Sequence, residues 1–187
     1  IASIYRRVDA WATSAATGLY DATVTAASDD PDLDGEQEYL IYNDRVFAIF
    51  EAIGGRLIGG WVRDVQTNAV FQTIGNQLSY AGMADETEGE TNISAGAVNA
   101  YRASAFRDQF LQTGGVGVGT TQYVNDLYSV APAAAGTGWA FTSSDGKIVK
   151  TITLQPRATV LQASYGIPAG NRLFVRFGLS PNLSDLL

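Results

Sequence analysis

The segment of this 187-residue sequence with the clearest chemical potential is an acidic loop. It places Asp30, Asp32 and Asp34 at alternate positions, and Gly35 follows them. Alternating Asp residues before a Gly resemble the start of an EF-hand loop, in which carboxylate oxygens converge on one Ca²⁺ and the Gly permits a sharp bend. We therefore expect Ca²⁺ at Asp30, Asp32 and Asp34.

A complete EF-hand is excluded, because its twelfth position needs a bidentate Glu and Ile41 occupies that position here. Glu36 and Glu38 come directly after the aspartates and could complete the ligand set in a loop of another geometry. The alternative is a solvated acidic turn that holds no metal, because charged runs in polar segments usually face water.

A second acidic stretch contains Asp85, Glu86, Glu88 and Glu90. Paired carboxylates hydrolyse glycosidic bonds when a cleft holds them about 5–9 Å apart. The stretch lies within residues 82–100, which are small, polar and without a clear period, so we expect a long loop with these acids facing solvent.

Four tyrosines flank Gly-rich or polar segments, which makes them better candidates for the surface than the three tryptophans. Aromatic faces stack on the apolar faces of sugar rings, although most aromatic residues of a β-sandwich belong to its core. The candidate carbohydrate-binding residues are Tyr80, Tyr101, Tyr123 and Tyr128.

The composition excludes several classes of function. The sequence has no Cys and no His, which removes disulfides, thiolate and Ser-His chemistry, zinc fingers and most catalytic zinc sites. A net charge of −7 argues against partners with a phosphate backbone and against anionic membrane surfaces. No apolar run approaches the ~18 residues of a membrane-spanning helix, so neither nucleic acid nor a membrane is an expected partner.

The cellular location is not fixed by these features. Because the sequence begins at Ile1 rather than Met, we expect a processed or excised product. The absence of Cys is compatible with the cytoplasm and with bacterial export. We favour an extracellular or periplasmic location.

The N-terminal segment 1–20 has the pattern of one amphipathic helix. Ile4, Val8, Trp11 and Ala15 recur at steps of three or four and share one face. Gly18 is a plausible C-cap. We expect this helix and a linker to occupy residues 1–27, and a β domain to occupy residues 28–187.

The rest of the sequence is dominated by short runs typical of strands, separated by turn dipeptides. These runs are residues 38–43, 45–51, 56–64, 69–74, 77–80, 139–141, 147–154, 159–165 and 172–178. Because no helical pattern is interleaved with them, we expect an all-β fold, an antiparallel β-sandwich with at least ten strands and one N-terminal helix. The imperfect alternation of residues 147–154 favours a strand covered on both faces.

Two segments remain ambiguous. Residues 101–112 fit a short helix or a bent segment. Residues 114–119 repeat Gly and Val, but they lack the βαβ context and the Lys of a nucleotide loop, so an edge strand or turn is favoured.

The run EYLIYNDRVFAIFEAIGGRL at Glu38–Leu57 resembles the opening hairpin of a β-supersandwich domain of carbohydrate-active enzymes. DGKIVKTITL, TVLQASYGIP and RLFVRFGLSPNL are similar to the closing strands of the same type of domain. The likeness covers roughly residues 30–182. It is strongest to the C-terminal sandwich of glycoside hydrolase family 57-like α-glucan enzymes, and more distant to galactose-mutarotase-like folds.

The resemblance implies a supersandwich fold and an association with carbohydrate, but no catalytic residue. Mutarotases use His as the general acid, and this chain has none. The catalytic carboxylates of family 57 enzymes lie in a barrel that this sequence does not contain. For the core between the sheets we expect ten apolar residues: Phe47, Ile49, Leu57, Trp61, Ile148, Ile152, Leu161, Tyr165, Phe174 and Phe177.

The expected function is that of a non-catalytic accessory domain of an α-glucan-acting enzyme. Such a domain packs against the catalytic domain of the parent enzyme, its expected partner, and can contact polysaccharide. The alternatives are a free-standing carbohydrate-binding module and, from another class, a hydrolase or lyase that depends on carboxylates.

Overall fold

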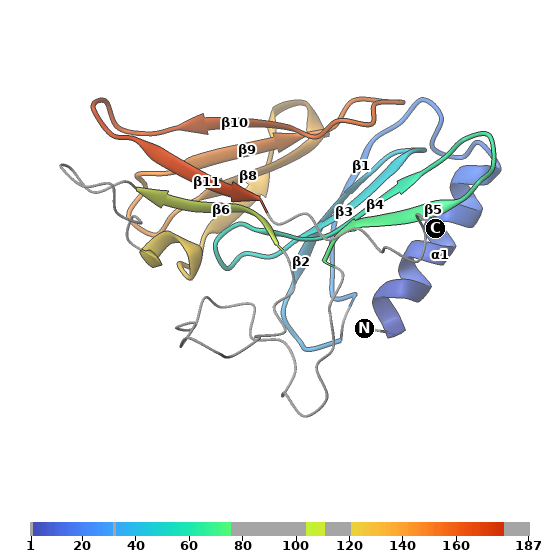
Figure 1. The fold of residues 1–187 in the computed structure, drawn as a ribbon, viewed down its shortest axis with the longest axis horizontal. Helices are drawn as coiled ribbons and strands as arrows, with labels where there is room; N and C mark the ends of the chain where they lie inside the picture. Colours follow the sequence, from blue (N-terminus) through green and yellow to red (C-terminus); the bar gives the residue numbers. More distant parts are fainter. Residues whose placement is uncertain (1, 32, 76–103, 111–120, 178–187) are drawn as a thin grey trace, which may run out of the picture.

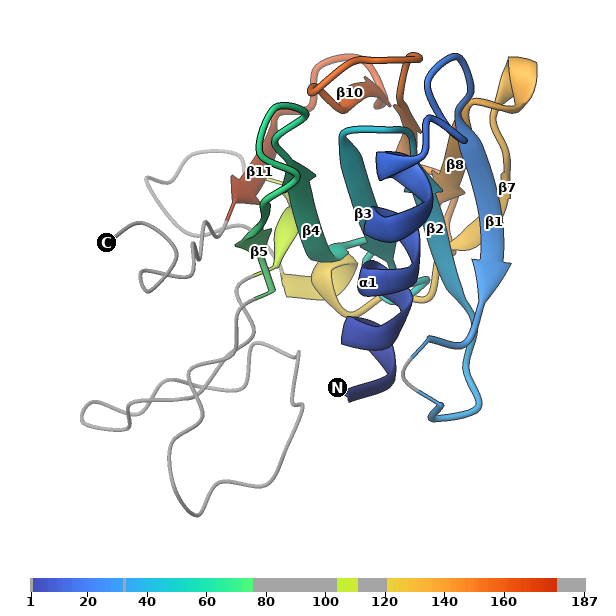
Figure 2. The ribbon, with the colours of Figure 1, turned by 90° about the vertical axis from the view of Figure 1, so that its right-hand side faces the viewer.

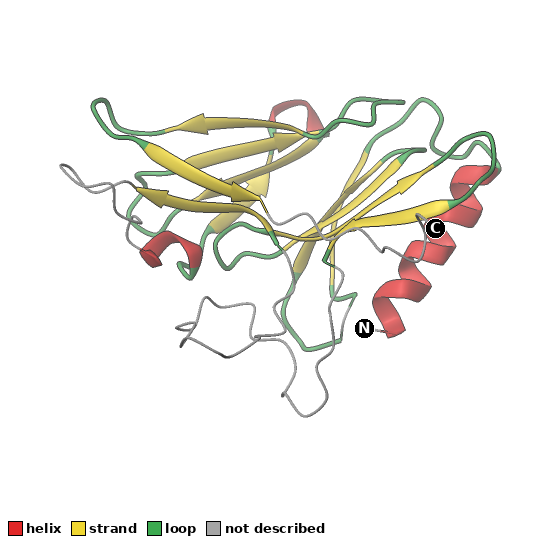
Figure 3. Ribbon diagram, in the orientation of Figure 1, coloured by secondary structure: helices red, strands yellow, loops and turns green. Residues whose placement is uncertain are grey.

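The computed structural model describes residues 2–31, 33–75, 104–110 and 121–177, which form two packed antiparallel sheets and one α-helix that covers the larger sheet (Figure 1). Eleven strands lie in these residues, with two short 3-10 helices besides the α-helix (Figure 3). The predicted all-β antiparallel sandwich with a single N-terminal helix is therefore confirmed.

Helix α1 (Ala2–Ala16) buries the face that its sequence predicts, with Ile4, Val8, Trp11 and Ala15 inward. Figure 2 shows the helix lying across one face of the larger sheet. The Trp11 Nε1 donates to the carbonyl of Asn43 at 2.7 Å, which fixes the helix to the sheet.

The larger sheet has seven strands in the order β1-β2-β3-β4-β6-β11, with β5 also paired to β4. Its strands are β1 (Thr25–Asp29), β2 (Glu38–Tyr42), β3 (Val46–Phe50), β4 (Leu57–Arg63), β5 (Val70–Ile74), β6 (Ala105–Phe110) and β11 (Leu173–Phe177). Strand β4 pairs with β5 over Gly60–Arg63 and with β6 at Leu57, so β5 and β6 share the same edge of β4.

The smaller sheet has four strands in the order β10-β9-β8-β7. They are β7 (Ser129–Pro132), β8 (Gly138–Thr142), β9 (Val149–Thr153) and β10 (Gln162–Gly166), and the 3-10 helices are η1 (Thr121–Val124) and η2 (Ala134–Gly136). Strand β9 buries Lys150 and Ile152 and leaves the alternate residues half-buried or exposed. The prediction that both faces of this strand are covered is therefore wrong for the described residues.

Two apolar clusters hold the three layers together. One lies between α1 and the larger sheet, and the other lies between the two sheets. Leu57, Ile148 and Ile152 belong to the second cluster as predicted, and Leu161 and Tyr165 pack against it.

The predicted core is corrected at the other five positions. Phe47, Ile49 and Trp61 are buried, but under the helix rather than between the sheets. Phe174 and Phe177 are 45% and 57% exposed, because β11 lies at the edge of the sheet formed by the described residues and pairs there with β6. The sequence marks all five as apolar but contains no information on which layer covers them.

Three further observations bear on the predicted elements. The ambiguous segment 101–112 contains strand β6, so the short helix is not formed over Ala105–Phe110. Strand β1 crosses the expected boundary between residues 27 and 28 and joins the sheet by pairing with β2. Residues 77–80, 82–100 and 114–119 lie outside the described residues.

Within the described part of the chain, no helix combines the length and the apolar character that crossing a bilayer requires.

Candidate functional site

A cavity of about 420 Å³ beside the start of β2 is the first candidate site. Three segments line it: residues 36–39, residues 51–53 after β3, and the link between η1 and β7 with Asn125 and Leu127. The register of β2 and β3 pairs Tyr39 with Phe50, which brings the neighbouring positions Glu38 and Glu51 to the same end of the two strands.

Hydrogen bonds between loops hold the wall of this cavity in place. The amide of Gly54 donates to the Asp126 carbonyl at 2.7 Å, and the amide of Tyr128 donates to the Ala52 carbonyl at 3.0 Å. Gly54 has φ 68°, and an added Cβ would lie 2.4 Å from the Val124 carbonyl oxygen. Only glycine fits this close approach, so the Gly-Gly turn positions the link that closes the cavity.

The polar groups of the cavity suit hydroxyl-bearing ligands. Glu36 and Asn125 are exposed, Glu51 is half-buried and paired with Arg56, and Glu38 is 4% exposed. Carboxylates accept hydrogen bonds from sugar hydroxyls, and an amide side chain both donates and accepts. Tyr39 also lines the cavity, but its ring packs edge-on against Trp139, with 5.2 Å between ring centroids. The ring therefore belongs to the packing of the core.

The predicted calcium loop is organised by its own carboxylates. The Asp30 carboxylate accepts from the amides of Leu33, Asp34 and Gly35 at 2.7, 3.2 and 3.1 Å. Asp34 in turn accepts from the amide of Glu36 at 2.8 Å. These contacts account for the bend of the loop, since Asp side chains commonly stabilise turns in this way.

The remaining predicted ligands are Asp32, Glu36 and Glu38. Glu36 and Glu38 line the cavity described above, and Asp32 lies outside the described residues. No group of three or more acidic side chains arranged to hold a metal ion occurs among the described residues. The Ca²⁺ site stays a prediction.

The predicted sugar-binding tyrosines do not form a surface in the described structure. Tyr80 and Tyr101 lie outside the described residues. Tyr123 and Tyr128 are 3% and 2% exposed, so the expectation that they lie at the surface is wrong. The ring of Tyr123 packs edge-on against Phe110, with centroids 5.1 Å apart, because η1 is folded against β6.

Tyr123 also belongs to a small polar network with Asp145. Its hydroxyl donates to Asp145 at 2.7 Å, and burial together with that carboxylate raises the pKa of Tyr123 to about 12. Lys147 lies 2.9 Å from the same carboxylate. Burial opposes ionisation of Asp145, but the contacts to Tyr123, Lys147 and Ser143 outweigh it and hold the pKa well below its usual range.

A fully buried ion pair lies between the two sheets. Lys150 of β9 and Asp108 of β6 are both 0% exposed, and Nζ is 2.7 Å from Asp108 Oδ2. Nζ also donates to the carbonyls of Gly54 at 3.1 Å and Phe106 at 2.9 Å. The Tyr165 hydroxyl donates to Asp108 Oδ1 at 2.9 Å, and the Tyr128 hydroxyl lies 3.4 Å from Oδ2.

Sequence reasoning missed this pair. The signal was present as a single Lys in the middle of the apolar run at residues 147–154, since a charged residue there is either at an exposed face or paired in the core. Its partner could not be identified, because Asp108 lies 42 positions away in a segment whose fold was ambiguous.

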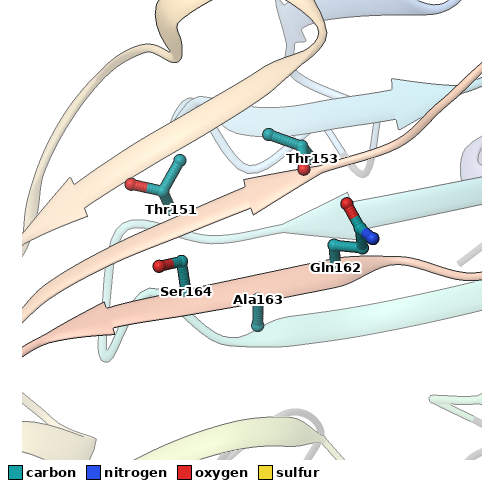
Figure 4. Close-up of a pocket in the computed structure, with 5 residues that line it drawn as sticks. All are labelled: Thr151, Thr153, Gln162, Ala163 and Ser164. Atoms are coloured by element: carbon teal, nitrogen blue, oxygen red, sulfur yellow. The ribbon is translucent and has the colours of Figure 1, made fainter.

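A second hollow, of about 390 Å³, lies on the outer face of the smaller sheet. Its lining residues are Thr151, Thr153, Gln162, Ala163 and Ser164 (Figure 4). The register pairs Thr151 with Ser164 and Thr153 with Gln162, so hydroxyl and amide groups stand in cross-strand pairs on one face. None of these five residues is charged, which suits a neutral polar ligand.

No family model, no curated protein and no solved structure matches this chain. What the fold and the site define is therefore a class: an antiparallel β-sandwich with an N-terminal helix and an acidic cavity at the end of the larger sheet.

Proposed function

We propose that this chain is a non-catalytic accessory domain of an α-glucan-acting enzyme, which contacts polysaccharide through the cavity at Glu36 and Asn125. The observation that carries the proposal is the cavity itself, whose rim offers carboxylate and amide groups to sugar hydroxyls. The likeness of the opening and closing strands to supersandwich domains of carbohydrate-active enzymes supports the glucan as ligand.

The binding test compares two surfaces of the same molecule. Affinity for soluble starch and maltoheptaose is measured by isothermal titration for the unmodified chain and for Glu36→Gln and Asn125→Ala, whose side chains are exposed. Each change should weaken binding about tenfold, which is about 1.4 kcal/mol. Gln162→Ala in the hollow of the smaller sheet is the matched control and should bind normally.

Two results would contradict the proposed site. A loss of affinity confined to Gln162→Ala would move the glucan to the outer face of the smaller sheet. No measurable binding by the unmodified chain would leave only the packing role, in which the domain contacts a catalytic domain and no polysaccharide.

A free-standing carbohydrate-binding module is the alternative within the same class. The two differ in what the complete reading frame encodes. A catalytic barrel in the same frame supports the accessory role, and a frame without a catalytic domain supports the free module.

A hydrolase is the second candidate function, because Glu38 and Glu51 line one cavity. Hydrolysis needs one carboxyl as acid and another as base or nucleophile. We expect no release of sugar from starch, pullulan or chromogenic α-glucosides above a buffer blank. Turnover that is lost in Glu51→Gln but kept in Asp64→Asn, a change outside the cavity, would replace the binding role with an enzymatic one.

A further inference from the structure

The buried pair of Lys150 and Asp108 links two different sheets. Lys150 belongs to the four-stranded sheet and Asp108 to the seven-stranded sheet, and the pair is fully shielded from solvent. Three aromatic rings surround the ammonium group, with centroids at 5.4 Å for Tyr128, 5.8 Å for Tyr165 and 6.0 Å for Phe141. The pair is therefore held in a dry, aromatic compartment.

Burial in such a compartment favours the neutral forms of both groups. Removal from water raises the pKa of Asp108, against the opposing effect of Lys150. Removal from water likewise lowers the pKa of Lys150. Transfer of one proton across the 2.7 Å contact from Nζ to Oδ2 gives an amine and a carboxylic acid, which are a nucleophile and an electrophile.

The backbone holds the amine in an orientation suited to attack. After the proton transfer, the two remaining N–H groups can keep their bonds to the carbonyls of Gly54 and Phe106. The lone pair then points where the transferred proton was, toward the carboxyl group of Asp108. Holding two reacting groups in this way replaces an encounter in solution by an intramolecular step.

Both anchoring carbonyls come from residues with left-handed backbone, φ 68° at Gly54 and φ 62° at Phe106. Phe106 lies in a bulge of β6, where the register against β11 skips from Arg107 to Ala105. A bulge takes a residue out of the ladder and redirects its groups. The non-glycine residue in this conformation is a strained feature of the kind that accumulates at functional sites.

The carboxyl group is also positioned for activation. Tyr165 donates to Oδ1, the oxygen on which negative charge develops when an amine adds to the carbon. Tyr128 lies beside Oδ2, the oxygen that leaves. Burial and the Asp108 charge raise the pKa of both tyrosines, so both hydroxyls keep their protons and remain donors.

We propose that Lys150 and Asp108 condense to an intramolecular isopeptide bond that joins the two sheets covalently. The Nζ–Cγ bond forms and the Cγ–Oδ2 bond breaks. One proton of the amine passes to the departing oxygen, which already carries the proton from the first transfer, and one water molecule is released. No oxidant or other reactant is needed, and the product removes two charges from the core.

The chain contains a matched pair in a different environment. Lys147 and Asp145 lie 2.9 Å apart, but their side chains are 57% and 27% exposed. Both side chains are accessible to water, so no condensation is expected there. A bond at Lys150 without one at Lys147 would show that burial, rather than proximity alone, causes the reaction.

The test is the intact mass of the purified chain in denaturing solvent, followed by tryptic mapping. The expected mass is lower than that of the sequence by one water molecule. Trypsin should fail to cut after Lys150, so residues 148–157 should appear joined to residues 108–147, while cleavage after Lys147 is normal. Lys150→Arg should retain the full calculated mass.

The proposal would be overturned by the full mass in the unmodified chain, or by recovery of residues 148–150 and 151–157 as separate peptides. A deficit of one water that maps to any other residue pair would also overturn it. The mass and the map of the unmodified chain decide the matter even where Lys150→Arg does not fold.

Discussion

Asn43 connects the two sheets through a side chain that is fully buried. Its amide group donates to the carbonyls of Gln155 at 2.9 Å and Ala158 at 2.8 Å, in the loop between β9 and β10. Its oxygen accepts from the amides of Arg45 at 2.8 Å and Val46 at 2.9 Å, where the turn after β2 leads into β3. Asn43→Ala removes all four hydrogen bonds at once.

The size of the effect follows from those four contacts. Each hydrogen bond contributes about 0.5–1.5 kcal/mol net, and a buried group left without a partner costs about 1–3 kcal/mol. The carbonyls of Gln155 and Ala158 belong to exposed or partly exposed residues, so water can replace part of the hydrogen bonding that these carbonyls lose. We expect Asn43→Ala to lower the free energy of unfolding by about 3–4 kcal/mol.

The measurement is urea unfolding followed by tryptophan fluorescence. Asn171→Ala is the control, since among the described residues the Asn171 side chain donates to carbonyls of its own exposed turn, and this change should cost about 0.5 kcal/mol or less. Asn43→Asp keeps the acceptor but turns a carboxylate toward two carbonyls, so it should destabilise less at low pH, where protonation restores one donor. A loss below about 1 kcal/mol for Asn43→Ala would refute this account of how the sheets are joined.

Three further outcomes are expected. Gly138→Ala should prevent folding or strongly lower the melting temperature, because the added Cβ would lie 1.9 Å from the Ile152 carbonyl oxygen. Gly166→Ala should be tolerated, because the atom nearest to its Cβ is 3.7 Å away, and equal melting temperatures of the two variants would contradict this prediction. The folded pKa of Asp145 lies below its unfolded value of about 3.9, so the contribution of Asp145 to stability is present above that pH and is lost as the pH falls. The difference in urea midpoint between the unmodified chain and Asp145→Asn should therefore shrink below about pH 4. A difference that does not change with pH would show that the carboxylate contributes nothing. If the Asp30 loop binds Ca²⁺, a hundredfold excess of the ion over its Kd should raise the free energy of unfolding by about 2.7 kcal/mol, seen as a higher melting midpoint than in EDTA. Identical midpoints would contradict the Ca²⁺ prediction.

The acidic cavity shows what a sequence motif can predict and what it cannot. The sequence identified Glu36 and Glu38 as chemically interesting through their place after three aspartates. It assigned them to a metal loop, whereas in the structure they line a cavity with Glu51 and Asn125. Those partners come from positions after β3 and before β7, and only the folded chain brings these segments together.

Local patterns determined most of the elements. A repeat of three and four residues places Ile4, Val8, Trp11 and Ala15 on one helical face, because a helix has a fixed turn, and that face is the buried one. Short β-branched and aromatic runs between turn residues likewise marked most of the strands, because strand geometry depends on neighbouring residues.

Only the tertiary structure decided which layer covers each apolar side chain and which polar groups meet. Phe47 and Ile49 pack under a helix, Tyr123 and Tyr128 are covered by elements distant in sequence, and Lys150 faces Asp108 from another sheet. The physical reason is that burial and pairing depend on contacts between segments far apart along the chain, whereas a sequence pattern records only the neighbours of a residue.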